Sequence, residues 1–259
     1  MTNAPTSGPH ADEEHARIRS VYEFYDRDKR EQRKRDSTNP GVRLNSEGRL
    51  AAILGIMQRL NLKEGFRLLD VGCGNGTDLR YISAEFSCLH PRLHGVDILD
   101  RRIGIARRQV PSATIQKSGA EALPFEDCCF DVVLASTIFS SILSSQITRA
   151  AAAEIARVVT SGGTILCYDT RYPNPSNPHT RPIRPRELKR LFPDASVVLT
   201  PITLLPPVAR HLGAFTHSLY RPLHALAPLR SHYLAVIRPD HLTVQASSQL
   251  APGSRGGRH

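Results

Sequence analysis

The sequence has few aromatic residues, no tryptophan and no long apolar run. Aromatic residues make up 6% of its 259 positions, so few rings are available to stack on nucleic-acid bases. No stretch of about 18 apolar residues occurs, and no membrane-spanning helix is therefore predicted. The five cysteines lack the spacings of disulfide frameworks and zinc sites. We therefore expect reduced thiols, no metal site and a cytoplasmic protein.

The charge is unbalanced, with 34 Lys and Arg against 24 Asp and Glu and a formal net charge of +10. The basic residues gather in 17–49 and 171–190. This balance fits nucleic acid, lipid head groups or an anionic substrate, and it equally fits a solvated basic surface. Nucleic acid therefore stays open as a partner, less favoured than a small molecule, and a homodimer stays open as well.

A glycine-rich turn is the most informative stretch of the chain. The apolar run 66–71 predicts a buried strand, and three glycines spaced Gly-x-Gly-x-Gly follow it before a helical pattern resumes. Glycines at such a turn let a ligand approach the main chain, and the helix start offers free N–H groups. Thr77 stands where the dinucleotide fingerprint has its third glycine, which argues against a dehydrogenase.

Over about residues 66–169 the chain resembles the class I S-adenosylmethionine-dependent methyltransferases. The most specific part is Asp70-Val71-Gly72-Cys73-Gly74-Asn75-Gly76, followed by a strand that ends in an acid able to hold ribose hydroxyls. The resemblance implies S-adenosylmethionine as the cofactor. It implies that the cofactor contacts Asp70, Gly72, Cys73, Gly74, Gly76, Asp97 and Ile98, and, through a third motif at 118–125, Gly119, Ala120 and Glu121. Gly119 stands where the family commonly has aspartate.

The ends of the fourth and fifth expected strands supply the remaining candidates. Ser136 and Thr137 lie where the family's chain passes the sulfonium, so we expect Ser136 at the cofactor and Thr137 in catalysis; such hydroxyls serve equally as helix caps. Tyr168 and Asp169 end the fifth strand and are the other two catalytic candidates, with Asp169 as the candidate general base or substrate anchor. The alternative for this acid is a buried structural carboxylate paired with one of two arginines, Arg171 or Arg181.

Alternating strand and helix patterns predict an α/β fold with a mostly parallel sheet and helices on both faces. The resemblance implies a Rossmann-like sheet of seven strands that ends in an antiparallel pair. Strands are expected near 66–71, 93–97, 113–116, 130–135, 163–169, 195–199 and 232–237, and helices near 14–35, 50–60, 76–85, 100–109 and 145–159. The segment Ser161-Gly162-Gly163 is expected to end the last of these helices.

The same patterns divide the chain into four parts. We expect a disordered tail over 1–14, an N-terminal helical cover over 15–62, a methyltransferase core over 63–239 with a substrate-cover insertion at about 170–230, and a disordered tail over 240–259.

Methyl transfer from a sulfonium is an in-line displacement, for which a protein supplies alignment, exclusion of water and sometimes removal of a proton. We expect transfer to a small molecule, foremost to an oxygen of a bacterial metabolite or sugar. The reason is a further resemblance, through 139–143, Tyr168-Asp169 and 205–210, to a bacterial subgroup assigned to polysaccharide, glycolipid and secondary-product pathways. The alternatives are an RNA, DNA or peptide N-methyltransferase and a cofactor-binding protein without catalysis.

Overall fold

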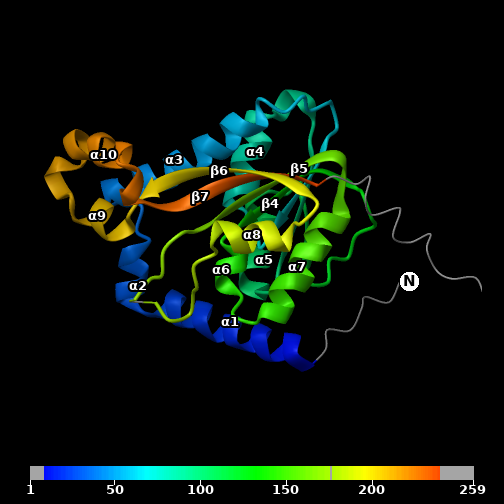
Figure 1. Ribbon diagram of the computed structural model, residues 1–259, viewed down its shortest axis with the longest axis horizontal. Helices are drawn as coiled ribbons and strands as arrows, with labels where there is room; N and C mark the ends of the chain where they lie inside the picture. The colour runs from blue at the N-terminus through cyan, green and yellow to red at the C-terminus, as the bar shows by residue number, and fades with distance from the viewer. Residues whose placement is uncertain (1–8, 176, 240–259) are drawn as a thin grey trace, which may run out of the picture.

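A seven-stranded sheet runs through the molecule, with helices on both faces (Figure 1). The computed structural model describes residues 9–175 and 177–239. In the order β3-β2-β1-β4-β5-β7-β6, strands β1 to β5 are parallel and β7 runs antiparallel to both of its neighbours. The predicted fold class is therefore confirmed. The strands are β1 (Arg67–Val71), β2 (Arg92–Asp97), β3 (Thr114–Lys117), β4 (Phe130–Ser136), β5 (Val159–Thr170), β6 (Ala195–Leu204) and β7 (Arg230–Pro239).

Each face of the sheet buries its own apolar cluster. Leu68 and Leu69 are neighbours in β1 and point to opposite faces, as alternate strand residues do. Helices α3, α4 and α5 cover the face of Leu68, and α7 covers the face of Leu69 with a stripe of apolar residues at helical spacing. The helices are α1 (Pro9–Arg27), α2 (Lys29–Lys34), α3 (Pro40–Met57), α4 (Thr77–Glu85), α5 (Asp100–Gln109), α6 (Ile138–Ser141), α7 (Ser145–Val158), α8 (Pro185–Leu191), α9 (Pro206–His211) and α10 (Thr216–Ala225).

The N-terminal part differs from the expectation in two ways. Helix α1 begins at Pro9, so the expected disordered tail over 1–14 is wrong from residue 9 onward, while residues 1–8 lie outside the described residues. Buried contacts of Ala11 and Glu14 with the body hold this part of the helix. The single helix expected over 14–35 is also divided, because the Asp28 carboxylate accepts hydrogen bonds from the first amides of α2 and caps a new helix.

The glycines before the fifth strand do not end α7, as had been expected. Helix α7 ends at Val158, and Ser161, Gly162 and Gly163 belong to β5, which begins at Val159 beside Phe130. The register between β4 and β5 shifts here, and Gly162 has φ +85°, which glycine adopts without strain. The segment is therefore an irregularity inside the strand pair.

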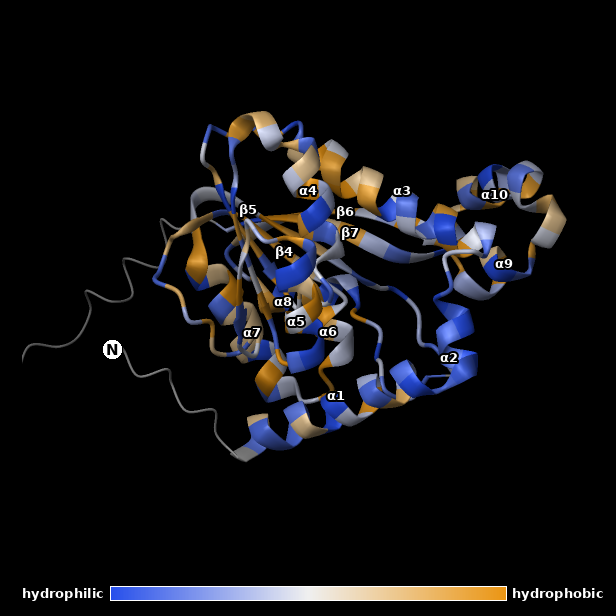
Figure 2. Ribbon diagram, turned by 180° about the vertical axis from the view of Figure 1, so that it is seen from behind, coloured by the Kyte–Doolittle hydropathy of each residue, from blue (hydrophilic) through white to orange (hydrophobic). Residues whose placement is uncertain are grey.

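The segment expected as a substrate cover, 170–230, divides into separate parts. Its first part lies beside α1, where the Tyr25 hydroxyl donates to the Asn177 side chain. Its last part, residues 205–229, forms the α9–α10 lobe, which projects from one end of the molecule and packs on α3 (Figures 1 and 2). A small apolar cluster that includes Leu204, Ala209 and Tyr220 holds this lobe in place. The expected tail over 240–259 lies outside the described residues.

Candidate functional site

The turn between β1 and α4 needs glycine at each of its three glycine positions. Gly72, Gly74 and Gly76 have φ values of +71°, +54° and +79°, which L residues rarely adopt. A Cβ at Gly72 would also lie 2.2 Å from the Ile138 side chain, and one at Gly76 would lie 3.1 Å from Ala106 of α5. The turn therefore exposes main chain at Gly72, whereas Gly76 serves the packing of α4 on α5.

The carboxylate of Asp97 lies at the end of β2 and is held by the main chain. Its two oxygens accept hydrogen bonds from the amides of Gly74 and Leu99, each at 2.9 Å. Burial raises the pKa of Asp97, although these two amides oppose the rise. Each oxygen keeps a further lone pair, so the carboxylate is fixed in position and can still accept two hydroxyl groups.

A first cavity, about 150 Å³ in volume, opens beside Asp97 under helix α1. His15, Ile18 and Tyr22 of α1 form one wall. Seven of the predicted cofactor residues line the cavity: Gly72, Asp97, Ile98, Gly119, Ala120, Glu121 and Ser136. Residues from three separate loops thus enclose a space with the acceptor oxygens of Asp97 at its side.

Glu121 points into this cavity but already has a partner. The His15 ring lies 3.0 Å from its carboxylate, and although burial raises the pKa of Glu121, the hydrogen bond and charge of His15 bring it below its usual range. A Cβ at Gly119 would lie 2.3 Å from a Glu121 oxygen. The glycine that replaces the family's usual aspartate therefore makes room for a contact between α1 and the loop after β3.

A second cavity, about 230 Å³, lies on the other side of the glycine turn. Of the predicted residues it is lined by Asp70, Cys73 and Tyr168, together with Gly72, Ser136 and Thr137, which line both cavities. The two cavities therefore meet at the ends of β1 and β4. Of the predicted cofactor residues, Gly74 and Gly76 line neither cavity and act through the shape of the turn.

Asp70 is the most strongly perturbed acid at this second cavity. Burial, and after it the charge of Asp78, raise the pKa of Asp70 well above its usual value, while Arg49 lowers it. Its Oδ1 atom is buried and has no hydrogen-bond partner among the described residues. A buried carboxylate oxygen without a partner is costly, so this atom points to a donor group in a bound ligand.

Arg49 of α3 closes the same cavity and was not predicted. Its guanidinium donates to both oxygens of Asp78, at 2.6 and 2.7 Å, and it lies over the Tyr168 ring with 5.5 Å to the ring centre. The sequence carries no local sign of this pair because its members are 29 residues apart on different helices. The pair places a positive group beside Asp70.

Tyr168 and Thr137, two predicted catalytic residues, are held by neighbouring strands. The Tyr168 hydroxyl is 3.0 Å from that of Thr203, and the ring stacks on His232 at 4.7 Å. Burial raises the pKa of Tyr168 to about 12, so the group is a neutral phenol near neutral pH. Thr137 has φ +57°, and its amide donates to the carbonyl of Tyr168, which ties the end of β4 to the end of β5.

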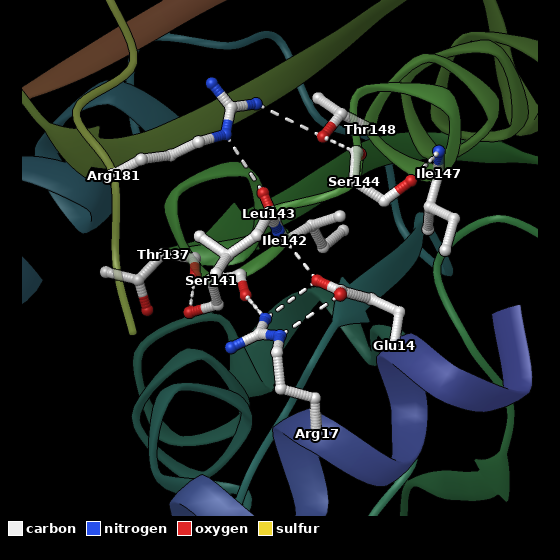
Figure 3. A network of polar contacts seen from close by, with 10 residues as sticks. All are labelled: Glu14, Arg17, Thr137, Ser141, Ile142, Leu143, Ser144, Ile147, Thr148 and Arg181. Atoms are coloured by element: carbon white, nitrogen blue, oxygen red, sulfur yellow. Dashed lines mark hydrogen bonds and ion pairs between the residues drawn. The ribbon is translucent and has the colours of Figure 1, made fainter. Parts of the chain in front are cut away.

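Asp169, the third predicted catalytic residue, lies apart from both cavities. Its side chain is fully buried, and its oxygens accept from the amides of Ser140 and Thr170 at 3.1 and 2.8 Å. Of the two arginines expected as alternative partners, Arg171 donates to the carbonyls of Ala227 and Arg230. Arg181 donates to the carbonyl of Ile142 and to Thr148 (Figure 3), and its ion-pair partner is Glu187. This placement disagrees with contact between Asp169 and a substrate and gives the acid the role of holding the chain after β4.

Helix α1 is held against the segment that follows β4 by a second set of contacts, which the sequence did not indicate. Glu14 accepts from the amide of Leu143 at 2.7 Å and pairs with Arg17, which in turn donates to the carbonyl of Ser141 (Figure 3). Burial raises the pKa of Glu14, but the bonds from Arg17 and Leu143 outweigh it and lower the pKa overall. The wall of the first cavity is therefore held by these polar contacts together with the packing of Ala11 and Ile18 on the core.

Comparison with known proteins gives this site its context. A family described as "Methyltransferase domain" matches residues 68–163. The chain carries a class I S-adenosylmethionine-dependent methyltransferase domain. S-adenosylmethionine is accordingly the cofactor, and the Asp97 carboxylate and the unpartnered Asp70 oxygen suit its hydroxyl and ammonium groups.

Two curated relatives each match less than half of this chain. The chain is 36% identical over 116 residues to a phthiotriol/phenolphthiotriol dimycocerosates methyltransferase of Mycobacterium ulcerans, covering 44% of this chain and 40% of that protein. It is 35% identical over 111 residues to a fatty-acid O-methyltransferase of Mycolicibacterium smegmatis, covering 42% and 38%. The matches thus span less than half the length of these relatives.

Among solved structures, the plantazolicin methyltransferase BpumL, in complex with a triazolic desmethylPZN analog and SAH, has a TM-score of 0.58. It is 14% identical, and the match covers 89% of this chain and 98% of that one. At this identity the likeness concerns the fold alone. It extends the comparison from the central domain to most of the described chain.

Among the described residues, no group of three or more His, Cys, Asp and Glu side chains is arranged to hold a metal ion. Across 9–175 and 177–239, none of the helices combines the length and the apolar character that crossing a bilayer requires. Cytoplasmic location and a homodimer stay predictions.

Proposed function

We propose that the protein transfers the methyl group of S-adenosylmethionine to an oxygen atom of a small molecule. The observation that carries the proposal is the set of groups where the two cavities meet. Gly72, Ser136 and Thr137 line both cavities, and they offer main chain and hydroxyl groups rather than a nucleophile. Such a junction suits direct displacement, in which the protein aligns two reactants and excludes water.

The cofactor, when bound, supplies a methyl group already activated on a sulfonium. Asp97 would hold the ribose hydroxyls, because both of its oxygens are fixed by main-chain amides. The unpartnered oxygen of Asp70 would accept the ammonium group of the methionine part, and Arg49, one wall of the same cavity, would lie near its carboxylate. These contacts fix both ends of the cofactor and leave the junction between the cavities for the acceptor.

The surroundings of the junction favour an acceptor oxygen that is already ionised. Tyr168 is a neutral phenol, and Asp169 lies away from both cavities, so neither is suited to take a proton from an acceptor. A carboxylate or an acidic phenol needs no such base. The name of the Mycolicibacterium smegmatis relative, a fatty-acid O-methyltransferase, supports an acid of this kind as acceptor.

The nucleic-acid alternative has less support at this site. Cys73 lines the second cavity, but burial, and after it the charges of Asp70 and Asp97, raise the pKa of its thiol, which keeps it protonated and a poor nucleophile. After β4 the chain reads Ser136-Thr137-Ile138, without the Asn/Asp-Pro-Pro-Tyr/Phe motif that grips a flipped amino group.

The experiment that tests the function is an acceptor screen with methyl-labelled S-adenosylmethionine. Separate pools contain long-chain and aromatic acids, phenols, sugars, peptides, and total RNA. We expect label in the acid or phenol pool, as an ester or ether. Label in RNA or peptide alone would contradict the proposal, and transfer to no pool by a protein that binds S-adenosylhomocysteine would favour a binding protein without catalysis.

A further inference from the structure

A cavity of about 690 Å³ lies outside the cofactor site, between α3, α10 and β6. We call it the α3–α10 groove. Leu44, Gly48 and Ala52 of α3 form one wall, and Ile202 and Thr203 of β6 form the floor. Its volume falls in the range of small-molecule sites, and small side chains on α3 leave room for an apolar body.

The wall opposite α3 is basic. His217, Arg221 and His224 recur at i, i+4 and i+7 on α10, so all three line the groove. The sequence from 195 to 239 contains no Asp or Glu, and the one acid at the groove, Glu47, pairs with Arg43 at 3.7 Å.

Arg221 is the fixed positive charge of this wall. Burial, and after it the charge of Arg230, lower the pKa of His224, so this ring is uncharged near neutral pH. Arg221 is exposed and forms no ion pair among the described residues. A guanidinium in this position is available to hold an anion.

The groove adjoins the cofactor site. Arg49 lines both the groove and the second cavity. Thr203 of the floor is bonded to the hydroxyl of Tyr168, which lines that cavity from the other side. Thr203 also has φ +65°, an uncommon value for a β-branched residue, and such backbone strain gathers at functional sites. Few side chains therefore separate a ligand in the groove from the cofactor.

We propose that the α3–α10 groove holds the methyl acceptor, and that this acceptor is an apolar molecule with a second anionic group at the end away from the reacting oxygen. The apolar body lies over Gly48, Ala52 and Ile202, and Arg221 binds the anion. The other end points past Arg49 toward the cofactor. This proposal rests on the proposed function and adds the class of acceptor to it.

The first measurement is calorimetric titration of the full chain, loaded with S-adenosylhomocysteine, with straight-chain acids, which supply the apolar body and the anion for Arg221 but not the reacting end of the acceptor. We expect dodecanoate to bind about tenfold more tightly than dodecanol, because only the acid pairs with Arg221. From octanoate to dodecanoate each added methylene raises the affinity about three- to fourfold, as burial of apolar surface does.

Two pairs of variants locate the binding. Gly48→Leu fills the groove without a clash, since the nearest atom to a Cβ there is the Tyr220 hydroxyl at 4.0 Å, and it weakens dodecanoate at least tenfold. Gly55→Leu, two turns further along the same helix and outside the groove, is its control. Arg221→Gln removes the preference for acid over alcohol, whereas Arg190→Gln on α8 keeps it.

The outcomes separate the two proposals. Failure of dodecanoate to bind a chain that binds S-adenosylhomocysteine, or equal binding by the Gly48→Leu and Gly55→Leu variants, overturns the groove as the acceptor site and leaves the proposed function standing. Failure of S-adenosylhomocysteine itself to bind a folded chain counts against the proposed function.

Discussion

At the scale of single residues, Asp97 is expected to contribute most to cofactor affinity. Replacing it with alanine removes a charged acceptor that both ribose hydroxyls would share, and we expect a loss of ~1.5–3 kcal/mol in the binding free energy of S-adenosylhomocysteine. Asp97→Asn keeps one acceptor oxygen for the turn, and Asp100→Ala, three residues on and exposed, is the control. Calorimetry that gives Asp97→Ala the affinity of the control would remove Asp97 from the site.

Asp169 gives a prediction about stability instead. Burial raises its pKa to about 6, so the folded protein holds this proton up to a higher pH than the unfolded chain does. Between about pH 4 and pH 6 the unfolded state alone loses the proton, and stability therefore falls as pH rises through this window.

Asp169→Asn cannot ionise and is expected to lack this loss. From pH 4 to pH 7 the free energy of unfolding of the parent protein should fall by roughly 2–3 kcal/mol more than that of the variant, as measured by urea unfolding. Cofactor affinity should stay unchanged. If the variant instead keeps the parent's pH dependence of unfolding and loses turnover, Asp169 is the base that the sequence suggested.

At the scale of elements, α1 is a wall of the first cavity that polar contacts fasten to the body. Arg17→Met removes the bonds to Glu14 and to the carbonyl of Ser141 and leaves the lining of the cavity intact. We expect S-adenosylhomocysteine affinity to fall roughly three- to tenfold, because one or two net hydrogen bonds are lost. Trypsin should also cut within α1 sooner. Arg19→Met, on the same helix, is the control, and equal behaviour of the two variants would show that the fastening does not govern binding.

At the scale of the whole molecule, the net charge of +10 predicts weak, non-specific attraction to nucleic acid. We expect filter binding of a random single-stranded RNA at about 50 mM salt and its loss by about 200 mM, since the contacts are to phosphate only. Binding that persists at the higher salt and prefers one sequence would instead support the nucleic-acid alternative.

The features that the sequence predicted correctly are those encoded locally. The apolar run before Gly72 predicted β1, and the apolar run that ends at Asp97 predicted β2, because strand periodicity and turn glycines act over a few residues. The errors fell where distant contacts decide. The contact of Glu14 with Leu143 ordered a segment that its polar composition had suggested to be disordered. The pairing of Val159 with Phe130 placed the glycines of 161–163 inside a strand.

By itself, the sequence determined the strands and the glycine turn, since each depends on short-range patterns of apolar and turn residues, and the kind of cofactor followed from the resemblance of that turn to a known family. Only the tertiary structure decided which predicted residues face a cavity. In the folded protein Asp169 is buried against the amide of Ser140, and Arg49 of α3 donates to Asp78. Helix α10 lies opposite Gly48 and forms the groove with α3. These contacts join residues that are far apart in the sequence. They arise when separate helices and strands pack together, and a local sequence pattern does not predict such packing.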